Sequence, residues 1–159
     1  FVPTTSGLGG AAAVFSPSTM TILGKATFLY NLAYYGGAVH VTGLLNIIGE
    51  VDFSGNVASE HGGAISNLYS GSDMILGGRL RFFNNTAGGN GGAVNFGRAG
   101  YLAVTPGEGG VNFTSNFARG DGGAIAFEQA AGLSFGDGSI RFSNNTCTGS
   151  GGAIALLTS

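Results

Sequence analysis

A pair of motifs that recurs along the whole chain constrains its fold more than any other feature. In five copies a phenylalanine precedes an asparagine by three residues, and Gly-Gly-Ala followed by Val or Ile comes next. The pairs are Phe28 and Asn31, Phe53 and Asn56, Phe82 and Asn85, Phe113 and Asn116, and Phe142 and Asn145. A degenerate sixth copy places Phe1 ahead of Gly9, Gly10 and Ala11. Because the motifs are constant while their connectors vary in length, the sequence predicts a solenoid of stacked repeats.

Composition narrows the class of protein. Glycine makes up 32 of the 159 residues without a Gly-X-Y period, which excludes collagen, and 43% of the residues are hydrophobic, which is too many for a disordered linker. Only 9% of the residues are charged and the net charge is -2, so we expect no nucleic-acid partner. No apolar stretch approaches the roughly 20 residues of a membrane-spanning helix, and we expect no direct membrane insertion by this segment.

The ends of the sequence bear on its organisation. It starts at Phe1 without a methionine and stops shortly after a Gly-Gly-Ala-Ile, with no polar capping segment at either end. We therefore expect residues 1–159 to be a single β-helix segment of a longer repeat protein.

Between the motifs, apolar residues alternate with polar ones, as in a strand. Val51 and Phe53 flank Asp52, and Leu80 and Phe82 flank Arg81. A second apolar pattern follows each Gly-Gly, and a third lies in the connector, as in residues 44–48. Three short strands in a repeat of about 29 residues leave no room for a helix. The prediction is an all-β fold, a right-handed parallel β-helix of five to six coils.

Equivalent residues of such coils stack about 4.8 Å apart along the axis. Asparagine suits a stacked column because its amide donates and accepts in the same direction, coil after coil. We predict a structural ladder of Asn31, Asn56, Asn85, Asn116 and Asn145. Asparagine also tolerates the left-handed backbone of a sharp turn. The Gly-Gly pair suits a corner with positive φ or with no space for a Cβ.

The residue before each motif phenylalanine should face outward. This row reads Thr27, Asp52, Arg81, Asn112 and Arg141, so opposite charges are neighbours and the two arginines are separated. The order of charges is compatible with stacking.

The loop between each ladder asparagine and its Gly-Gly varies most, and variable loops on a rigid solenoid often carry recognition. Tyr34 and Tyr35 are candidate partner contacts, because paired aromatic rings stack on a sugar or anchor a protein. The alternative is that the short loop folds both rings over the edge of a coil. Glu60 and His61 are further candidate contacts and the best catalytic candidates, although adjacent polar residues in a loop are more often solvated.

The paired motifs FxxN and GGA(I/V/L) resemble the repeats of the chlamydial polymorphic membrane proteins, from Phe1 to Ile154. The resemblance implies a β-helix passenger of the autotransporter type that acts as an adhesin at the cell surface. Three Asn-X-Thr sequons, at Asn84, Asn112 and Asn144, are candidate glycosylation sites if the source is a secretory eukaryote. Such sequons also arise by chance in a repeat rich in Asn and Thr.

We predict a rigid, adhesin-like shaft that is extracellular or on the cell surface, is not an enzyme, and has a protein or glycan ligand. No catalytic residue, metal site or cofactor is expected. Two alternatives stay open. Few charges and open coil edges favour end-to-end or lateral self-association, as in a structural subunit of a fibre or surface layer. Parallel β-helices also include polysaccharide-binding and polysaccharide-processing enzymes, which need clustered carboxylates, and this chain has only eight acidic residues.

Overall fold

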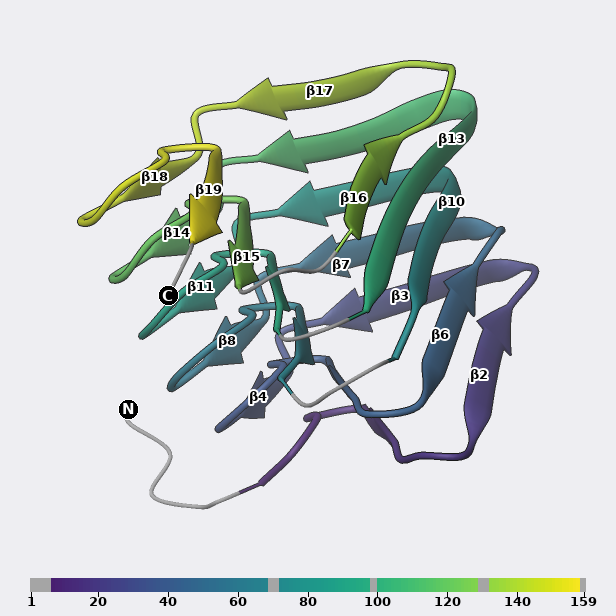
Figure 1. The fold of residues 1–159 in the computed structure, drawn as a ribbon, viewed down its shortest axis with the longest axis horizontal. Helices are drawn as coiled ribbons and strands as arrows, with labels where there is room; N and C mark the ends of the chain where they lie inside the picture. Colours follow the sequence, from purple (N-terminus) through teal and green to yellow (C-terminus); the bar gives the residue numbers. More distant parts are fainter. Residues whose placement is uncertain (1–6, 69–71, 98–99, 129–131, 158–159) are drawn as a thin grey trace.

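The computed structural model describes residues 7–68, 72–97, 100–128 and 132–157. These residues contain no helix and wind into a parallel β-solenoid of about five turns, which repeat about every 29 residues. Figure 1 shows the coils stacked from the N-terminal end at the bottom to the C-terminal end at the top. The described strand pairings are all parallel. The predicted all-β solenoid is therefore confirmed.

One sheet is formed by the strands that follow the Gly-Gly-Ala motifs, in the order β1-β5-β9-β12-β15-β19 among the described residues. These strands are β1 Ala12–Val14, β5 Val39–Val41, β9 Ile65–Asn67, β12 Val94–Phe96, β15 Ile125–Glu128 and β19 Ile154–Leu157. The first residue of β5, β9, β12 and β15 is a Val or Ile that is fully buried. The apolar residue after each Gly-Gly-Ala therefore anchors its strand in the core.

A long sheet contains the strands that lead into the motif phenylalanines. Its strands are β2 Thr19–Ile22, β3 Lys25–Leu29, β6 Leu44–Ile47, β7 Glu50–Ser54, β10 Met74–Phe83, β13 Tyr101–Thr114, β16 Gly132–Phe135 and β17 Ile140–Ser143. The sequence predicted two separate strands here in each coil. In two coils they are instead continuous, because β10 and β13 run around the corner seen on the right of Figure 1.

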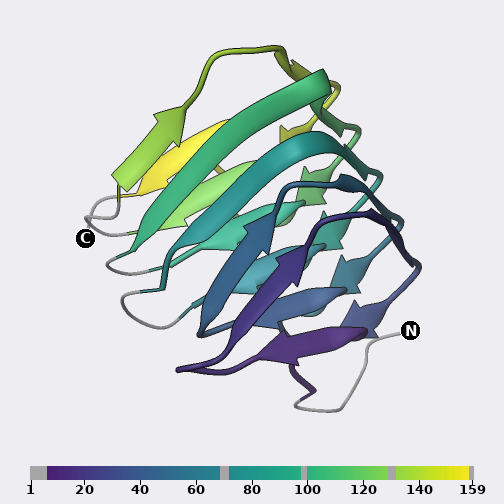
Figure 2. The ribbon, with the colours of Figure 1, turned by 90° about the vertical axis from the view of Figure 1, so that its right-hand side faces the viewer.

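The corner of the long sheet depends on glycine. The pairing of β10 with β13 shifts register between Gly78 and Leu80, and Gly78, Gly109 and Gly110 have positive φ. These residues turn the chain without ending the strand. Figure 2 shows the part of the sheet before the corner, with its strands side by side from purple to green.

A third sheet was not predicted from the sequence. It consists of two-residue strands after the ladder asparagines: β4 Leu32–Ala33, β8 Val57–Ala58, β11 Thr86–Ala87, β14 Phe117–Ala118 and β18 Thr146–Cys147. Two residues are too few to show an alternating pattern in the sequence. The strands start the segments that we call the arms, residues 32–35, 57–61, 86–90, 117–121 and 146–150, which project on the left of Figure 1.

The interior of the solenoid is organised in columns of identical residues. The rings of Phe28, Phe53, Phe82, Phe113 and Phe142 stack in parallel, with successive centroids 4.8, 4.9, 4.7 and 4.9 Å apart. The three middle rings of this column are fully buried. These separations match the spacing between neighbouring strands, so the coils stack in register.

The motif asparagines form a continuous hydrogen-bonded column, which we call the motif ladder. The backbone N–H and Nδ2 of Asn56 both donate to Asn85 Oδ1 at 3.0 Å, and Asn85 repeats the pattern with Asn116. The pairs Asn31 with Asn56 and Asn116 with Asn145 bond in the same way. Each Nδ2 from Asn56 to Asn145 also donates to the carbonyl of a motif phenylalanine in the preceding coil. Every amide group of Asn85 is therefore paired inside the protein.

The expectation that the ladder asparagines occupy the left-handed turn was wrong. Positive φ occurs at the residue before each of them: Tyr30, Gly55, Asn84, Ser115 and Asn144, with φ between 53° and 65°. The turn is completed one residue early, so that the ladder residue can direct its side chain along the column. The turn position accepts Tyr, Gly, Asn or Ser, whereas the ladder position is asparagine in every coil. The left-handed turn is therefore less selective for residue type than the ladder.

The two glycines of each Gly-Gly pair have different roles. The first, such as Gly91, has a φ of 68°, and a Cβ there would lie 2.3 Å from the carbonyl oxygen of Val94 in the same coil. The second, such as Gly92, would place a Cβ 2.1 Å from the carbonyl oxygen of Gly123 in the next coil. The first glycine makes the corner and the second allows the coils to approach.

Candidate functional site

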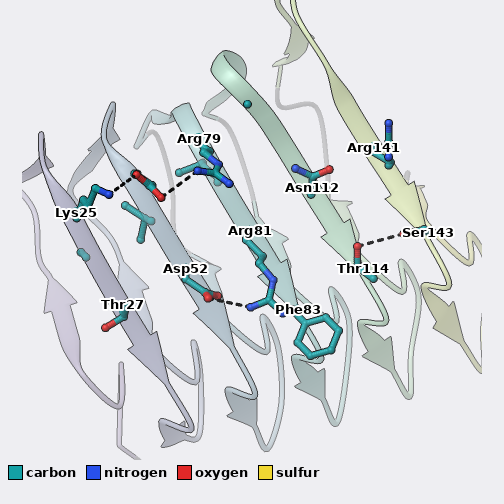
Figure 3. A pocket seen from close by; sticks show the side chains of 15 residues that line it. Lys25, Thr27, Asp52, Arg79, Arg81, Phe83, Asn112, Thr114, Arg141 and Ser143 are labelled. Carbon is teal, nitrogen blue, oxygen red and sulfur yellow. Dashed lines mark hydrogen bonds and ion pairs between the residues drawn. The ribbon is translucent and has the colours of Figure 1, made fainter.

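The outer face of the long sheet carries a shallow groove of about 700 Å³. Val51, Leu80 and the motif phenylalanines point into the core, so the residues between them point outward along β3, β7, β10, β13 and β17. Strand pairing places Thr27, Asp52, Arg81, Asn112 and Arg141 in one row, and Lys25, Glu50 and Arg79 in another. We call this surface the wall groove, and Figure 3 shows its lining side chains.

Three ion pairs cross the N-terminal half of the wall groove. Lys25 Nζ lies 3.0 Å from Glu50 Oε2, and Arg79 Nη1 lies 3.2 Å from Glu50 Oε1. Arg81 Nη1 lies 2.8 Å from Asp52 Oδ2. A hydrogen bond from Lys25, together with its positive charge, lowers the pKa of Glu50, and the charge of Arg79 acts in the same direction. Because the pairs are exposed they add little stability, and their main effect is to fix where charge is displayed.

The C-terminal half of the groove has basic and neutral polar groups without carboxylates. Arg141 is exposed, and within the described part of the chain it has no ion pair. The Arg81 guanidinium lies 4.3 Å from the centre of the Phe83 ring. The hydroxyls of Thr114 and Ser143 are hydrogen-bonded at 3.1 Å. This half of the groove therefore has unpaired positive charge beside hydroxyl, amide and aromatic groups (Figure 3).

The four arm residues singled out from the sequence lie together in one cluster. Tyr34 Oη donates to Glu60 Oε1 at 3.2 Å, and this hydrogen bond raises the pKa of Tyr34. The Tyr35 and His61 rings stack with their centroids 5.9 Å apart, and the Tyr34 and Tyr35 rings meet edge to face at 4.8 Å. All four residues are partly buried. Their side chains are directed largely at one another between two neighbouring arms.

The residues before the Gly-Gly pairs form a second column of hydrogen bonds, which we call the arm ladder. His61 Nδ1 accepts from the backbone N–H of Asn90 at 2.9 Å, and Asn90 Oδ1 accepts from that of Asp121 at 2.9 Å. Asp121 Oδ1 accepts from that of Ser150 at 2.6 Å. Glu60 and His61 therefore have different partners, and His61 Nδ1 is not free to take a proton from a substrate.

The three sequon asparagines lie in two different environments. Asn84 and Asn144 are exposed and have φ values of 54° and 53°, because each is the turn residue before a ladder asparagine. Asn112 is partly buried in the wall groove, between Arg81 and Arg141. Glycosylation of these residues remains a prediction, and a glycan on Asn112 would fill the groove.

Residues 7–68, 72–97, 100–128 and 132–157 contain no group of three or more His, Cys, Asp or Glu side chains that could hold a metal ion. Over the same ranges, no helix has the length and apolar character needed to cross a membrane.

Four segments of the chain, residues 50–68, 79–97, 110–128 and 139–156, match the model of the Chlamydia polymorphic membrane protein repeat. The chain therefore carries four repeats that are similar to the polymorphic membrane protein repeat. No curated protein and no solved structure matches the chain. The polymorphic membrane protein repeat and the solenoid fold together indicate a surface-associated repeat protein.

Each polymorphic membrane protein repeat corresponds to a defined part of a coil. The matches begin at residues 50, 79, 110 and 139, close to the start of the residues that line the wall groove, and they end in the strand after Gly-Gly-Ala or one residue beyond it. One repeat therefore contains one rung of the wall groove, one ladder asparagine and one arm. The connector before the corner of the long sheet lies outside the match.

The sequence analysis placed its candidate recognition residues on the arms and did not identify the wall groove as a candidate site. It used the outward row only as a sign of stacking, and it did not consider Lys25, Glu50 and Arg79. A signal was present. When the repeats are aligned on the motif phenylalanine, four of the six basic residues fall one or three positions before it, namely Lys25, Arg79, Arg81 and Arg141.

Proposed function

We propose that the chain is a non-enzymatic, adhesin-like shaft at the cell surface and that the wall groove is its ligand-binding face. The observation that supports this most is the gathering of charged and polar side chains from five strands in one groove. The motif ladder and the phenylalanine column hold the strands in fixed register, so the binding groups are positioned before a ligand arrives.

The hydrogen bonds and ion pairs of the carboxylates support a binding role rather than a catalytic one. Glu50 in the wall groove is paired with Lys25 and Arg79, which lowers the pKa of its carboxyl group and disfavours a role as a proton donor, and Asp52 is held in an ion pair with Arg81. In the arms, Glu60 accepts from Tyr34 and His61 accepts from a backbone N–H. Each candidate acid or base is thus already engaged in the fold.

Adhesion can be tested by measuring how much fluorescently labelled chain binds to cultured animal cells. The double variant Arg81→Gln with Arg141→Gln should lose most of the binding. Arg119→Gln is the control for a lost positive charge outside the groove, because Arg119 is an exposed arginine on an arm; it matches each of the single variants Arg81→Gln and Arg141→Gln in charge. Equal binding by the double variant and the control would contradict the proposal. Loss of binding only in a Tyr34→Ala, Tyr35→Ala variant would place recognition on the arms instead.

A further inference from the structure

We propose that the wall groove binds an anionic polysaccharide, which lies across the strands and parallel to the solenoid axis with its acidic groups on Arg81 and Arg141. This inference rests on the proposed binding face and names the chemical class of its ligand.

The distribution of charge favours an anionic ligand in this groove alone. The chain has six basic and eight acidic residues, and four of the basic residues line the groove against two of the acidic ones. The groove therefore has a formal charge of +2 in a chain whose net charge is -2. An acidic ligand is attracted to the groove and repelled by the rest of the surface.

The spacing of the two arginines suits a repeating anion. Arg81 lies on β10 and Arg141 on β17, with β13 between them, which separates their strands by about 10 Å. One sugar ring is about as long as one strand spacing, so acidic groups on alternate sugars would meet successive arginines. The planar guanidinium group binds carboxylate or sulfate oxygens through two parallel hydrogen bonds. Arg81 Nη1 already donates to Asp52 and Ser54, so a ligand would meet the other N–H groups of Arg81. The five strands of the groove span about 20 Å, so a ligand of several sugars fills it.

The neutral groups in the groove distinguish a sugar from a polyphosphate. Asn112 lies between the two arginines, and the Thr114 and Ser143 hydroxyls lie beside them. Amide and hydroxyl groups are partners for sugar hydroxyls. Phe83 is 36% exposed, and the part of its ring that the Arg81 guanidinium leaves uncovered offers an apolar surface for the C–H face of a sugar.

The proposal can be tested by calorimetric titration of the chain with four probes of similar length. Heparin oligosaccharides supply sulfate, oligogalacturonate supplies carboxylate alone, dextran oligosaccharides are neutral, and a single-stranded oligonucleotide supplies phosphate. At least one of the two acidic glycans should bind, with an affinity that falls as salt is raised, and dextran should not. Heparin and oligogalacturonate then separate sulfate from carboxylate recognition.

Matched variants assign the binding to the groove. Arg141→Gln should weaken binding of the acidic glycan about tenfold, Arg141→Lys should restore part of it, and Arg119→Gln should leave it unchanged. Arg141 is exposed, so these variants should keep the thermal unfolding midpoint of the parent. Tighter binding of the oligonucleotide than of both glycans, or equal losses in Arg141→Gln and Arg119→Gln, would overturn the proposal. If neither glycan binds but cell binding still depends on Arg81 and Arg141, the ligand class is wrong while the proposed function stands.

Discussion

The motif ladder and the arm ladder use the same hydrogen bond in two settings. In both, a side-chain atom accepts a hydrogen bond from the backbone N–H of the equivalent residue in a neighbouring coil. The motif ladder consists of asparagine at every step and is fully buried at Asn56, Asn85 and Asn116. The arm ladder changes from His61 to Asn90 to Asp121, and these residues are only partly buried.

This difference in residue type between the two ladders follows from the difference in burial. In the arm ladder a coil needs only an acceptor, because water can reach the remaining polar atoms. In the motif ladder the same side chain must also place its Nδ2 hydrogens, since an unpaired donor costs about 1–3 kcal/mol when buried. Asparagine meets both needs, whereas a carboxylate would lack the donor and would repel its stacked neighbours.

A third column of stacked residues contains an asparagine that is buried but not hydrogen-bonded. Ala13, His40, Ser66, Asn95 and Ala126 are in register on the outer face of the sheet that contains β5, β9 and β12. Asn95 is as buried as Asn85, yet within the described residues neither of its amide atoms has a hydrogen-bond partner. Replacing asparagine by alanine at Asn85, Asn90 and Asn95 therefore separates the effect of hydrogen bonding on stability from the effect of burial.

The largest effect is expected from a change that disturbs both ladders. Gly92→Ala places a Cβ 2.1 Å from the Gly123 carbonyl oxygen, and the coils must separate to accept it. We expect a loss of at least about 4 kcal/mol in the free energy of unfolding, measured by chemical denaturation. Gly24→Ala is the control, because a Cβ at Gly24 meets nothing within 4 Å. Similar stability of the two variants would show that the coils are not held at this distance.

In the motif ladder, Asn85→Ala removes one acceptor and one amide donor group. The backbone N–H and Nδ2 of Asn56 lose their acceptor, and the Phe53 carbonyl loses a donor. We expect a cost of about 4 kcal/mol in the free energy of unfolding, because the stranded groups are buried. Asn85→Asp keeps the acceptor and should still be strongly destabilised, since it buries a charge. A cost below about 1 kcal/mol for Asn85→Ala would contradict a stabilising role for the ladder.

In the arm ladder, Asn90→Ala should cost only about 1 kcal/mol, because water can replace the bonds to Asp121 N–H and Glu128 Oε1. Asn90→Asp keeps the acceptor for the Asp121 N–H but places a second carboxylate beside Glu128, so it should recover only part of this loss. Denaturation under the same conditions as for Asn85→Ala gives the comparison directly. If both alanine variants lost equal stability, burial would not explain why one ladder is uniform and the other is not.

The third column predicts sensitivity to acid. Burial lowers the pKa of His40 from its ordinary value of 6.5, so between these two pKa values the unfolded chain binds more protons than the folded one. Stability should therefore fall as the pH drops below about 6.5, by at most about 1.4 kcal/mol per pH unit. His40→Gln should remove this part of the fall when unfolding is measured between pH 7 and pH 5. An unchanged pH profile in that variant would assign the effect to other groups.

The smallest effect is expected at Asn95. Asn95→Ala removes a buried amide that has no partner, so the lost packing is offset by the removal of an unsatisfied group. We expect a change within about 1 kcal/mol in the free energy of unfolding. A cost above about 2 kcal/mol would mean that the amide is hydrogen-bonded to buried water, which high-resolution density would reveal.

The sequence predicted the elements that repeat in chain order. Phe53, Asn56 and Gly62 recur with nearly fixed spacing, and Val51 with Phe53 shows the two-residue period of a strand, so both the coil and its parallel stacking could be predicted. It failed where the signal was short or depended on backbone conformation. The two-residue strand Val57–Ala58 shows no period, and the left-handed turn lies at Gly55 rather than at Asn56.

The candidate site divides in the same way. That Asp52 and Arg81 are neighbours in an outward row could be read from the repeat, because both precede a motif phenylalanine. Three other features could not be predicted from the repeat. Glu50 is shared by Lys25 and Arg79, Arg141 has no ion pair among the described residues, and Tyr34 donates a hydrogen bond to Glu60. These contacts depend on the directions of long side chains, which the chain order does not specify.

Which residues share a column follows from the repeat and the strand period, because the repeat sets one rung per coil and the period sets which side of the sheet each residue faces. Which members of neighbouring columns pair, and where positive charge stays unpaired, depends on how the folded coils stack. Residues about 29 positions apart become neighbours only when the coils stack in register, and the pairing then follows from distances of a few ångströms between their side chains.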